Sequence, residues 1–118
     1  MIFGVGIDLT EIERFEKTDS ERFYVNCFAE SEREYMRGKD AETSAGLFAA
    51  KEAVVKALGT GFRGFWPKDV EITRDASGKP SVLLHGNAAR IAEERGVTKI
   101  HLSVTHNKTS AAAVAVLE

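Results

Sequence analysis

One long helix that ends on a glycine turn is the feature that most constrains this chain. Residues 48–58 are mostly strong helix formers, and the run stops at Gly59-Thr60-Gly61. Phe48, Glu52 and Lys56 are four residues apart, so they lie along one face of that helix. Glu52 and Lys56 form either an ordinary ion pair, worth about 0.2–0.5 kcal/mol, or a site at which Glu52 holds a cation and Lys56 meets an anion.

The N-terminal stretch bears on these two interpretations. Residues 2–7 are apolar apart from Gly4 and Gly6, which predicts a strand that another backbone approaches closely. Asp8 follows at the strand end, where a lone Asp is typical of a turn. A strand-end Asp combined with a mid-helix Glu suits Mg²⁺, because this ion commonly takes one or two carboxylates and completes its shell with water and phosphate. Asp8 and Glu52 are therefore the candidate magnesium ligands.

The rest of the sequence predicts an α+β domain built around the long helix. The expected order is β-α-α-α-β-β-α-β-β, which gives a mainly antiparallel sheet packed on the central helix. Thr10 with Glu13 and Ser31 with Glu34 are predicted to form capping boxes that begin short helices, and Asp40 to cap the central one. The predicted helices cover residues 11–16, 22–25, 31–37, 41–58 and 87–95, and the predicted strands residues 2–7, 70–74, 80–85, 99–106 and 110–117.

Composition excludes several classes of protein. With 118 residues, the chain is expected to form one domain, residues 1–118, with a modest core. Cys27 is the only cysteine, which excludes an internal disulfide and predicts a packing residue in a reducing compartment. A net charge of −2 argues against general nucleic-acid binding. Because no apolar run is long enough to cross a bilayer and no secretory signal precedes the first strand, we expect a cytoplasmic protein.

Three blocks of sequence together resemble one known family. They are Gly6-Ile7-Asp8 with Glu11-Ile12 and Arg14, then Phe48-Ala49-Ala50-Lys51-Glu52-Ala53 with Lys56-Ala57-Leu58-Gly59-Thr60-Gly61, and last Ser103-Val104-Thr105-His106. In this order and at these separations they resemble the holo-[acyl-carrier-protein] synthases, the short-chain branch of the 4′-phosphopantetheinyl transferases. The resemblance runs from Met1 to about Leu117, and the central block is its most specific part.

The resemblance implies a fold, an assembly and a reaction. The fold is that of the 4′-phosphopantetheinyl transferases, assembled as a homotrimer with active sites at the subunit interfaces. The reaction moves the phosphopantetheine arm of coenzyme A to a serine of apo acyl carrier protein and releases adenosine 3′,5′-bisphosphate. The serine hydroxyl attacks the β-phosphorus, a step that mainly needs positioning and charge neutralisation. Either a metal-bound water or a carboxylate accepts the serine proton.

The resemblance also assigns roles to single residues. Asp8 and Glu52 would hold Mg²⁺ on the diphosphate, and Lys56 would neutralise the leaving phosphate, which makes these three the catalytic candidates. Backbone N–H groups next to Gly59 and Gly61 can approach a phosphate, because glycine leaves it uncovered. The expected residues of the coenzyme A site are Lys56, Gly59, Thr60, Gly61, Thr105 and His106.

Carrier-protein docking is predicted at Arg14, extended by Arg22. Acyl carrier proteins are acidic, so a partner needs a positive patch despite its own net charge of −2. Arg14 is expected to be exposed beside Asp8, since Ile12 and Phe15 turn inward. The alternative is that Arg14 only pairs with a nearby glutamate, Glu11 or Glu13.

Other features leave alternatives open. Leu47 stands where many family members carry Arg, so a cationic contact to coenzyme A is expected to be missing or to come from Arg63 or a neighbouring subunit. Phe65 and Trp66 are predicted core residues, with a partner interface as the alternative. Two other functions also fit Asp8, Glu52 and Lys56: a magnesium-dependent hydrolase of another phosphoanhydride, or a non-catalytic module that keeps the fold.

Overall fold

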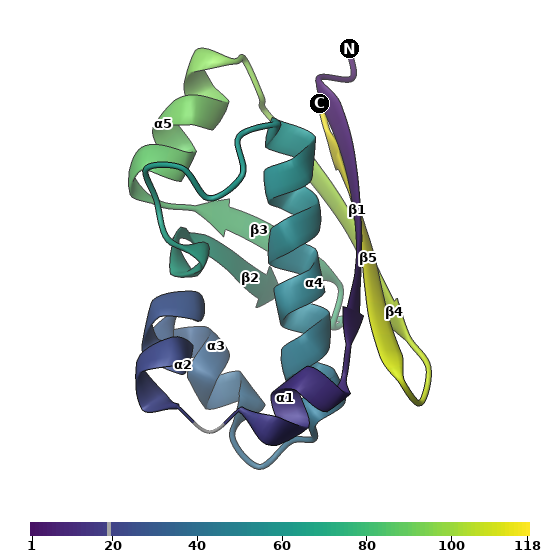
Figure 1. Cartoon of the computed structure of the whole chain (residues 1–118). Helices are drawn as coiled ribbons and strands as arrows, with labels where there is room; N and C mark the ends of the chain where they lie inside the picture. The colour runs from purple at the N-terminus through teal and green to yellow at the C-terminus, as the bar shows by residue number, and fades with distance from the viewer. Residues whose placement is uncertain (19) are drawn as a thin grey trace.

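The fold is organised around one long helix, α4 (Ala41–Leu58), near the centre of Figure 1. The computed structural model describes residues 1–18 and 20–118. In α4, 13 of the 18 residues are buried, so the helix is covered on most sides rather than lying on the surface. The helix ends at Gly59, whose φ of 77° is a left-handed conformation that glycine adopts without strain. The predicted end of the central helix is confirmed.

Within the described residues, five strands form two antiparallel sheets. β1 (Gly4–Glu11), β5 (Ser110–Leu117) and β4 (Ile100–His106) make a three-stranded sheet in that order, and β2 (Val70–Arg74) pairs with β3 (Pro80–Leu84). In Figure 1 the three-stranded sheet runs along one side of α4, whereas the β2–β3 pair and the shorter helices α2, α3 and α5 lie on the other. The predicted α+β architecture, with antiparallel strands packed on a long helix, is confirmed.

The shorter helices are present close to their predicted positions, but both predicted capping boxes are wrong. The elements are α1 (Glu13–Lys17), α2 (Glu21–Cys27), α3 (Glu30–Met36), the 3₁₀ turn η1 (Pro67–Asp69) and α5 (Gly86–Glu94). Thr10 belongs to β1, because β1 pairs with β5 along its whole length, and α1 begins after Ile12 without a side-chain cap. α3 begins at Glu30, one residue before its predicted start, and the Glu32 carboxylate accepts a hydrogen bond of 2.7 Å from the backbone N–H of Ala29. Asp40 precedes α4 as predicted, although its side chain makes no capping hydrogen bond.

β1 packs closely on α4 where the two elements cross. A Cβ atom added to Gly4 would lie 2.0 Å from the carbonyl oxygen of Ala57, and one added to Gly6 would lie 1.9 Å from that of Ala53. The strand backbone therefore rests directly on the helix backbone, and the close approach predicted for the two glycines is confirmed. Ala53 is fully buried at this crossing.

Other predictions have mixed outcomes. Cys27 is a free, buried thiol and Phe65 is buried, as expected. Trp66 is 56% exposed, so its prediction as a core residue is wrong. Leu47 is buried in the core and does not face the candidate site, whereas Arg63 is exposed. No helix in the part of the chain that the structure describes is long and apolar enough to cross a membrane.

Candidate active site

The crossing of β1 and α4 brings the predicted acidic residues together. Alternate residues of a strand point to the same side, so Gly6, Asp8 and Thr10 all face α4. Asp8 lies inside β1 opposite Ala113, not at the strand end as predicted. The Thr10 hydroxyl donates a 2.7 Å hydrogen bond to Oδ2 of Asp8, which orients that carboxylate. Sequence reasoning missed this role of Thr10, although its two-residue spacing from Asp8 already places both on one face.

Lys56 reaches across from α4 to the strand. Its Nζ lies 3.1 Å from Oδ1 of Asp8 and donates a second hydrogen bond of 3.1 Å to the carbonyl oxygen of Ile7. No hydrogen bond or ion pair joins Glu52 to Lys56 among the described residues, so the pair is not an ordinary intrahelical salt bridge. Lys56 is half exposed, with 53% of its side chain accessible, so an incoming anion can reach its ammonium.

Asp8 and Glu52 line one pocket of about 400 Å³ together with Lys56, Thr10 and Arg14. Burial raises the pKa of Glu52, and the negative charge of Asp8 raises it further, against the opposing effects of Lys56 and Arg14. A divalent cation would relieve the repulsion between the two carboxylates. Across residues 1–18 and 20–118, no group of three or more His, Cys, Asp or Glu side chains gathers as a metal cage. Two carboxylates beside an open pocket nevertheless fit Mg²⁺, which keeps water and substrate oxygens as its other ligands.

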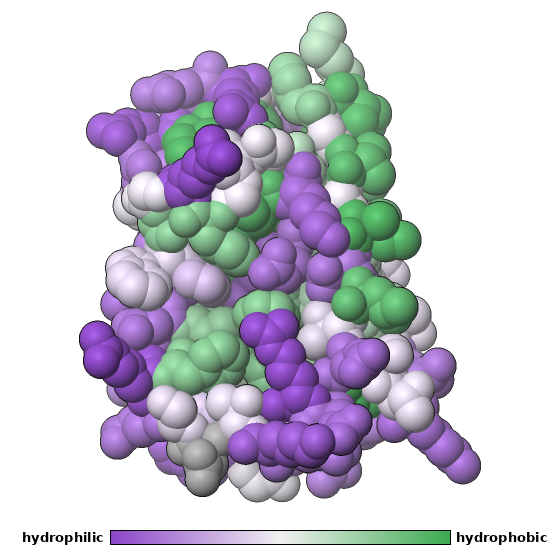
Figure 2. Space-filling model, in the orientation of Figure 1, coloured by the Kyte–Doolittle hydropathy of each residue, from purple (hydrophilic) through white to green (hydrophobic). Residues whose placement is uncertain are grey.

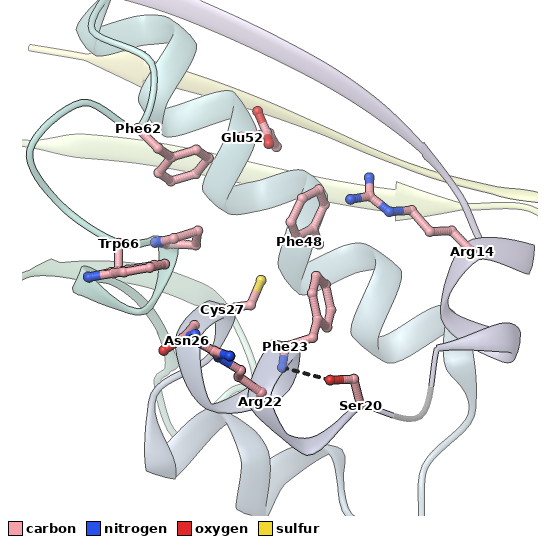
Figure 3. Close-up of a pocket in the computed structure, with 11 residues that line it drawn as sticks. Arg14, Ser20, Arg22, Phe23, Asn26, Cys27, Phe48, Glu52, Phe62 and Trp66 are labelled. Atoms are coloured by element: carbon pink, nitrogen blue, oxygen red, sulfur yellow. Dashed lines mark hydrogen bonds between the residues drawn. The ribbon is translucent and has the colours of Figure 1, made fainter.

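A second hollow opens beside the first and is called here the aromatic cleft. Its volume is about 420 Å³, and Arg14, Phe48 and Glu52 line both hollows. Figure 3 shows Phe62 and Trp66 on one wall, facing residues of α2 on the other, with α4 as the floor. The cleft is lined by Arg14, Ser20, Arg22, Phe23, Asn26, Cys27, Phe48, Glu52, Phe62, Trp66 and Pro67.

Both arginines predicted for docking stand at this cleft. The guanidinium of Arg14 lies 4.7 Å from the centre of the Phe48 ring, a cation–π contact. Glu13 pairs instead with Lys17 at 2.6 Å, and no ion pair of Arg14 with Glu11 or Glu13 exists among the described residues. The alternative in which Arg14 only pairs with a neighbouring glutamate therefore does not describe the structure.

The predicted coenzyme A residues do not all meet within one chain. Gly59, Thr60 and Gly61 follow Lys56 at the C-terminal end of α4, and both glycines have positive φ. His106 instead lies 3.6 Å from Glu42 in the first turn of α4. Glu42 and Lys56 are 14 residues apart, which is about 21 Å along a helix. Thr105 and His106 are thus far from the Lys56 of their own chain.

Comparisons with known proteins identify the family. The model of a family described as the 4′-phosphopantetheinyl transferase superfamily matches residues 4–116. The holo-[acyl-carrier-protein] synthase of Clostridium kluyveri is 48% identical over all of this chain and 91% of its own length, and that of Treponema denticola is 43% identical over 100% and 99%. Among solved structures, the Neisseria meningitidis synthase superposes with a TM-score of 0.91 at 31% identity, covering 100% of this chain and 99% of its own. The Helicobacter pylori synthase, solved in complex with coenzyme A, gives 0.85 at 27% identity, covering 97% and 99%.

The chain belongs to the 4′-phosphopantetheinyl transferase superfamily and, within it, to the holo-[acyl-carrier-protein] synthases. The resemblance that the three sequence blocks carry is confirmed.

Proposed function

We propose that the chain performs its family's reaction at the pocket shared by Asp8, Glu52 and Lys56, with one Mg²⁺ ion. A holo-[acyl-carrier-protein] synthase transfers the 4′-phosphopantetheine group of coenzyme A to a serine of apo acyl carrier protein, and this chain is such an enzyme. The observation that carries the site is geometric: two carboxylates from separate elements face one pocket, with an ammonium 3.1 Å from one of them.

The residues of the pocket divide the work of the transfer. Asp8 and Glu52 would hold the metal, which when bound neutralises the diphosphate of coenzyme A. Thr10 fixes the orientation of Asp8 through its 2.7 Å hydrogen bond. Lys56 moves from Asp8 onto the phosphate oxygens, where its positive charge stabilises the departing bisphosphate. Because the pocket opens into the aromatic cleft at Glu52, an acceptor serine can approach from that side.

Mass spectrometry tests the site directly. Apo carrier protein incubated with the chain, coenzyme A and Mg²⁺ should gain one phosphopantetheine group, and bisphosphate should appear only when carrier protein is present. Asp8→Asn and Glu52→Gln should each abolish transfer and weaken Mg²⁺ binding in equilibrium dialysis, whereas the exposed control Glu94→Gln should do neither. Full activity of both pocket variants in EDTA-treated buffer would refute the metal assignment, and bisphosphate release without carrier protein would indicate a hydrolase.

We also propose that apo acyl carrier protein docks over the aromatic cleft. Arg14 and Arg22 supply positive charge at its edge, and the aromatic rings offer an apolar surface between them. Exposed charges mainly set the encounter rate and are screened beyond about 8 Å at physiological salt. Arg14→Glu should raise the KM for carrier protein and weaken its salt dependence while leaving the KM for coenzyme A unchanged. Lys79→Glu, an exposed charge reversal between β2 and β3 and outside the lining of the cleft, is the control; equal effects of both variants would remove Arg14 from the docking surface.

The outer face of β1 supports assembly into a homotrimer with shared sites. Val5, Ile7 and Leu9 alternate with the residues that face α4, and between 62% and 71% of each is exposed. Figure 2 shows this face as a column of apolar side chains along one edge of the molecule. Such a stripe is typical of a protein–protein interface. A neighbouring subunit would also supply the Thr105 and His106 that the chain's own pocket lacks.

Subunit mixing tests the shared site. Lys56→Ala and His106→Ala are each expected to be nearly inactive, and mixing the two under exchange conditions should restore activity, because some interfaces then combine two intact contributions. An active monomer in light scattering, or no recovery on mixing, would contradict the shared-site trimer. The single domain over residues 1–118 and the cytoplasmic location stay predictions.

A further inference from the structure

A charged pair with no access to solvent lies beneath the aromatic cleft. Lys51 and Glu32 have side chains that are 0% exposed, and the Nζ of Lys51 lies 2.7 Å from Oε1 of Glu32. Lys51 precedes the pocket residue Glu52 in the sequence but points away from the pocket, into the space between α4, α3 and β2. Burial lowers the pKa of Lys51 and raises that of Glu32, and each effect is opposed by the charge of the partner.

The pair also satisfies four backbone groups. Lys51 donates to the carbonyl oxygens of Val70, at 2.6 Å, and Pro67, at 3.2 Å. Glu32 accepts hydrogen bonds from the backbone N–H groups of Ala29, at 2.7 Å, and Ile72, at 3.0 Å. The Pro67 carbonyl oxygen also accepts a hydrogen bond from the backbone N–H of Val70 and would keep that partner. An apolar pair of the same volume removes the side-chain partners of the other three groups, and each unsatisfied buried group costs about 1–3 kcal/mol. The charged pair therefore holds particular backbone segments in position, in addition to filling space in the core.

Those segments carry the two walls of the cleft. Pro67 itself lines the cleft, at the start of η1 and directly after Trp66. Ala29 comes two residues after Cys27, the last residue of α2, which forms the opposite wall. Lys51 also contacts the ring of Phe28, 5.4 Å from Nζ, at the turn that joins α2 to α3. One buried pair thus fastens both walls to the floor helix α4.

We propose that Lys51 and Glu32 are positioning residues that set the spacing of the cleft walls and thereby its fit to the carrier protein. The proposal rests on the docking of carrier protein at this cleft. The floor is held independently, because α4 is fixed by its buried neighbours and by the contacts of Gly4 and Gly6 with its backbone. Disturbing the pair should therefore move the walls while the metal and coenzyme A residues keep their geometry.

Glu32→Gln is the main test, since it keeps the shape and removes the charge. An amide offers one oxygen and one N–H₂ group, whereas the Glu32 carboxylate accepts from both Ala29 and Ile72. In either orientation, the N–H₂ group of Gln faces one of the two backbone N–H groups, of Ala29 or of Ile72, which are also donors. One hydrogen bond is therefore lost, and the segment that it held is less firmly attached. The KM for apo carrier protein should rise about tenfold, the effect of about 1.4 kcal/mol, with kcat and the KM for coenzyme A unchanged. Lys51→Met provides a second variant with the same expected split.

Trp66 provides a readout that does not depend on activity, because it is the only tryptophan and stands on one wall. Acrylamide should quench its fluorescence more strongly in Glu32→Gln than in the wild type. Leu102→Ala, a core variant on β4 chosen for a comparable loss of thermal stability, should change neither the quenching nor the KM for carrier protein. A failure of docking itself would appear as an unchanged KM in Arg14→Glu.

Two results would overturn the proposal. In the first, Glu32→Gln melts at a lower temperature but keeps the wild-type Trp66 quenching and KM for carrier protein, so the pair only stabilises the fold. In the second, kcat and the KM for coenzyme A change as much as the KM for carrier protein, so the pair acts on the floor. If Lys51→Met does not fold, Glu32→Gln alone decides between these outcomes.

Discussion

Replacing Gly6 by Ala tests the contact on which the geometry of the site depends. The added Cβ would lie 1.9 Å from the carbonyl oxygen of Ala53 and 2.7 Å from the backbone nitrogen of Ala57. Cβ atoms essentially never come closer than 3.0 Å to such atoms, so β1 must move at least 1.1 Å away from α4. Because both neighbours are backbone atoms of a buried helix, no side-chain rotation relieves the clash. Overpacking of this kind lowers the free energy of unfolding by about 1–3 kcal/mol, or about 4–12 °C in melting temperature.

The same displacement acts on the chemistry. Asp8 lies two residues after Gly6 on the strand that moves, whereas Glu52 and Lys56 lie on the helix that stays. A shift of about 1 Å opens the 3.1 Å contact between Asp8 and Lys56 and separates the two carboxylates that would hold Mg²⁺. Misplacement on that scale can lower a rate about 100-fold. We therefore expect Gly6→Ala to lose about that much turnover even at temperatures at which it is folded.

The assay combines thermal unfolding with transfer kinetics on the same preparation, measured well below the melting temperature. Gly46→Ala is the matched control, because its added Cβ meets only Val104, at 3.4 Å, in the interior of α4. Removing a glycine from a helix interior stabilises a protein by about 0.5–1 kcal/mol, so this control should melt higher and keep its activity. Wild-type stability and turnover in Gly6→Ala would refute the argument that strand and helix backbones are in contact.

Three further predictions follow from the same structure. Lys56→Ala should lower kcat about 10²–10³-fold, because it removes a charge that stabilises the transition state. The surface control Lys99→Ala should leave kcat unchanged. Since burial and Asp8 raise the pKa of Glu52, ionised Glu52 destabilises the metal-free fold at neutral pH. Glu52→Gln should therefore melt above the wild type at pH 7 without Mg²⁺, and the difference should shrink as the pH falls through the raised pKa; an unchanged or lower melting temperature would contradict this. Burial raises the pKa of Cys27 to about 12, so a disulfide reagent at pH 8 should find no reactive thiol until the protein unfolds.

Local patterns predicted those parts of the fold that local chemistry decides. The glycine stop at Gly59 predicted the end of α4, because a left-handed residue is needed there whatever packs around it. The spacing of Phe48, Glu52 and Lys56 predicted one functional helix face, since the helix period alone places them together. Gly4 and Gly6 predicted a close backbone approach, because no other residue type permits one.

Tertiary pairing decided the parts that the sequence misplaced. Thr10 has the chemistry of a helix cap, but eight residue pairs with β5 carry β1 as far as Glu11 and place Thr10 beside Asp8 instead. In the sequence, Glu32 looks like an ordinary helical glutamate. The fold buries it against Lys51, which lies on α4, 19 residues further along the chain. No local pattern marks a pair that forms only when distant elements meet. The wrong prediction for Trp66 has a similar origin. An apolar aromatic side chain is expected in the core, but the fold places Trp66 on a cleft wall, where it is exposed.

Strand β1 shows how one short element serves two tasks. Its inner row, with Gly6 and Asp8, fits the helix and the chemistry, while its outer row, with Val5 and Ile7, is apolar and exposed. A slip of one residue in the pairing with β5 exchanges the two rows, which puts Asp8 on the outer surface and a branched side chain against the backbone of α4. The same register that assembles the carboxylates therefore also displays the proposed subunit interface. Because both depend on one register, a variant that shifts β1, such as Gly6→Ala, should weaken assembly together with activity.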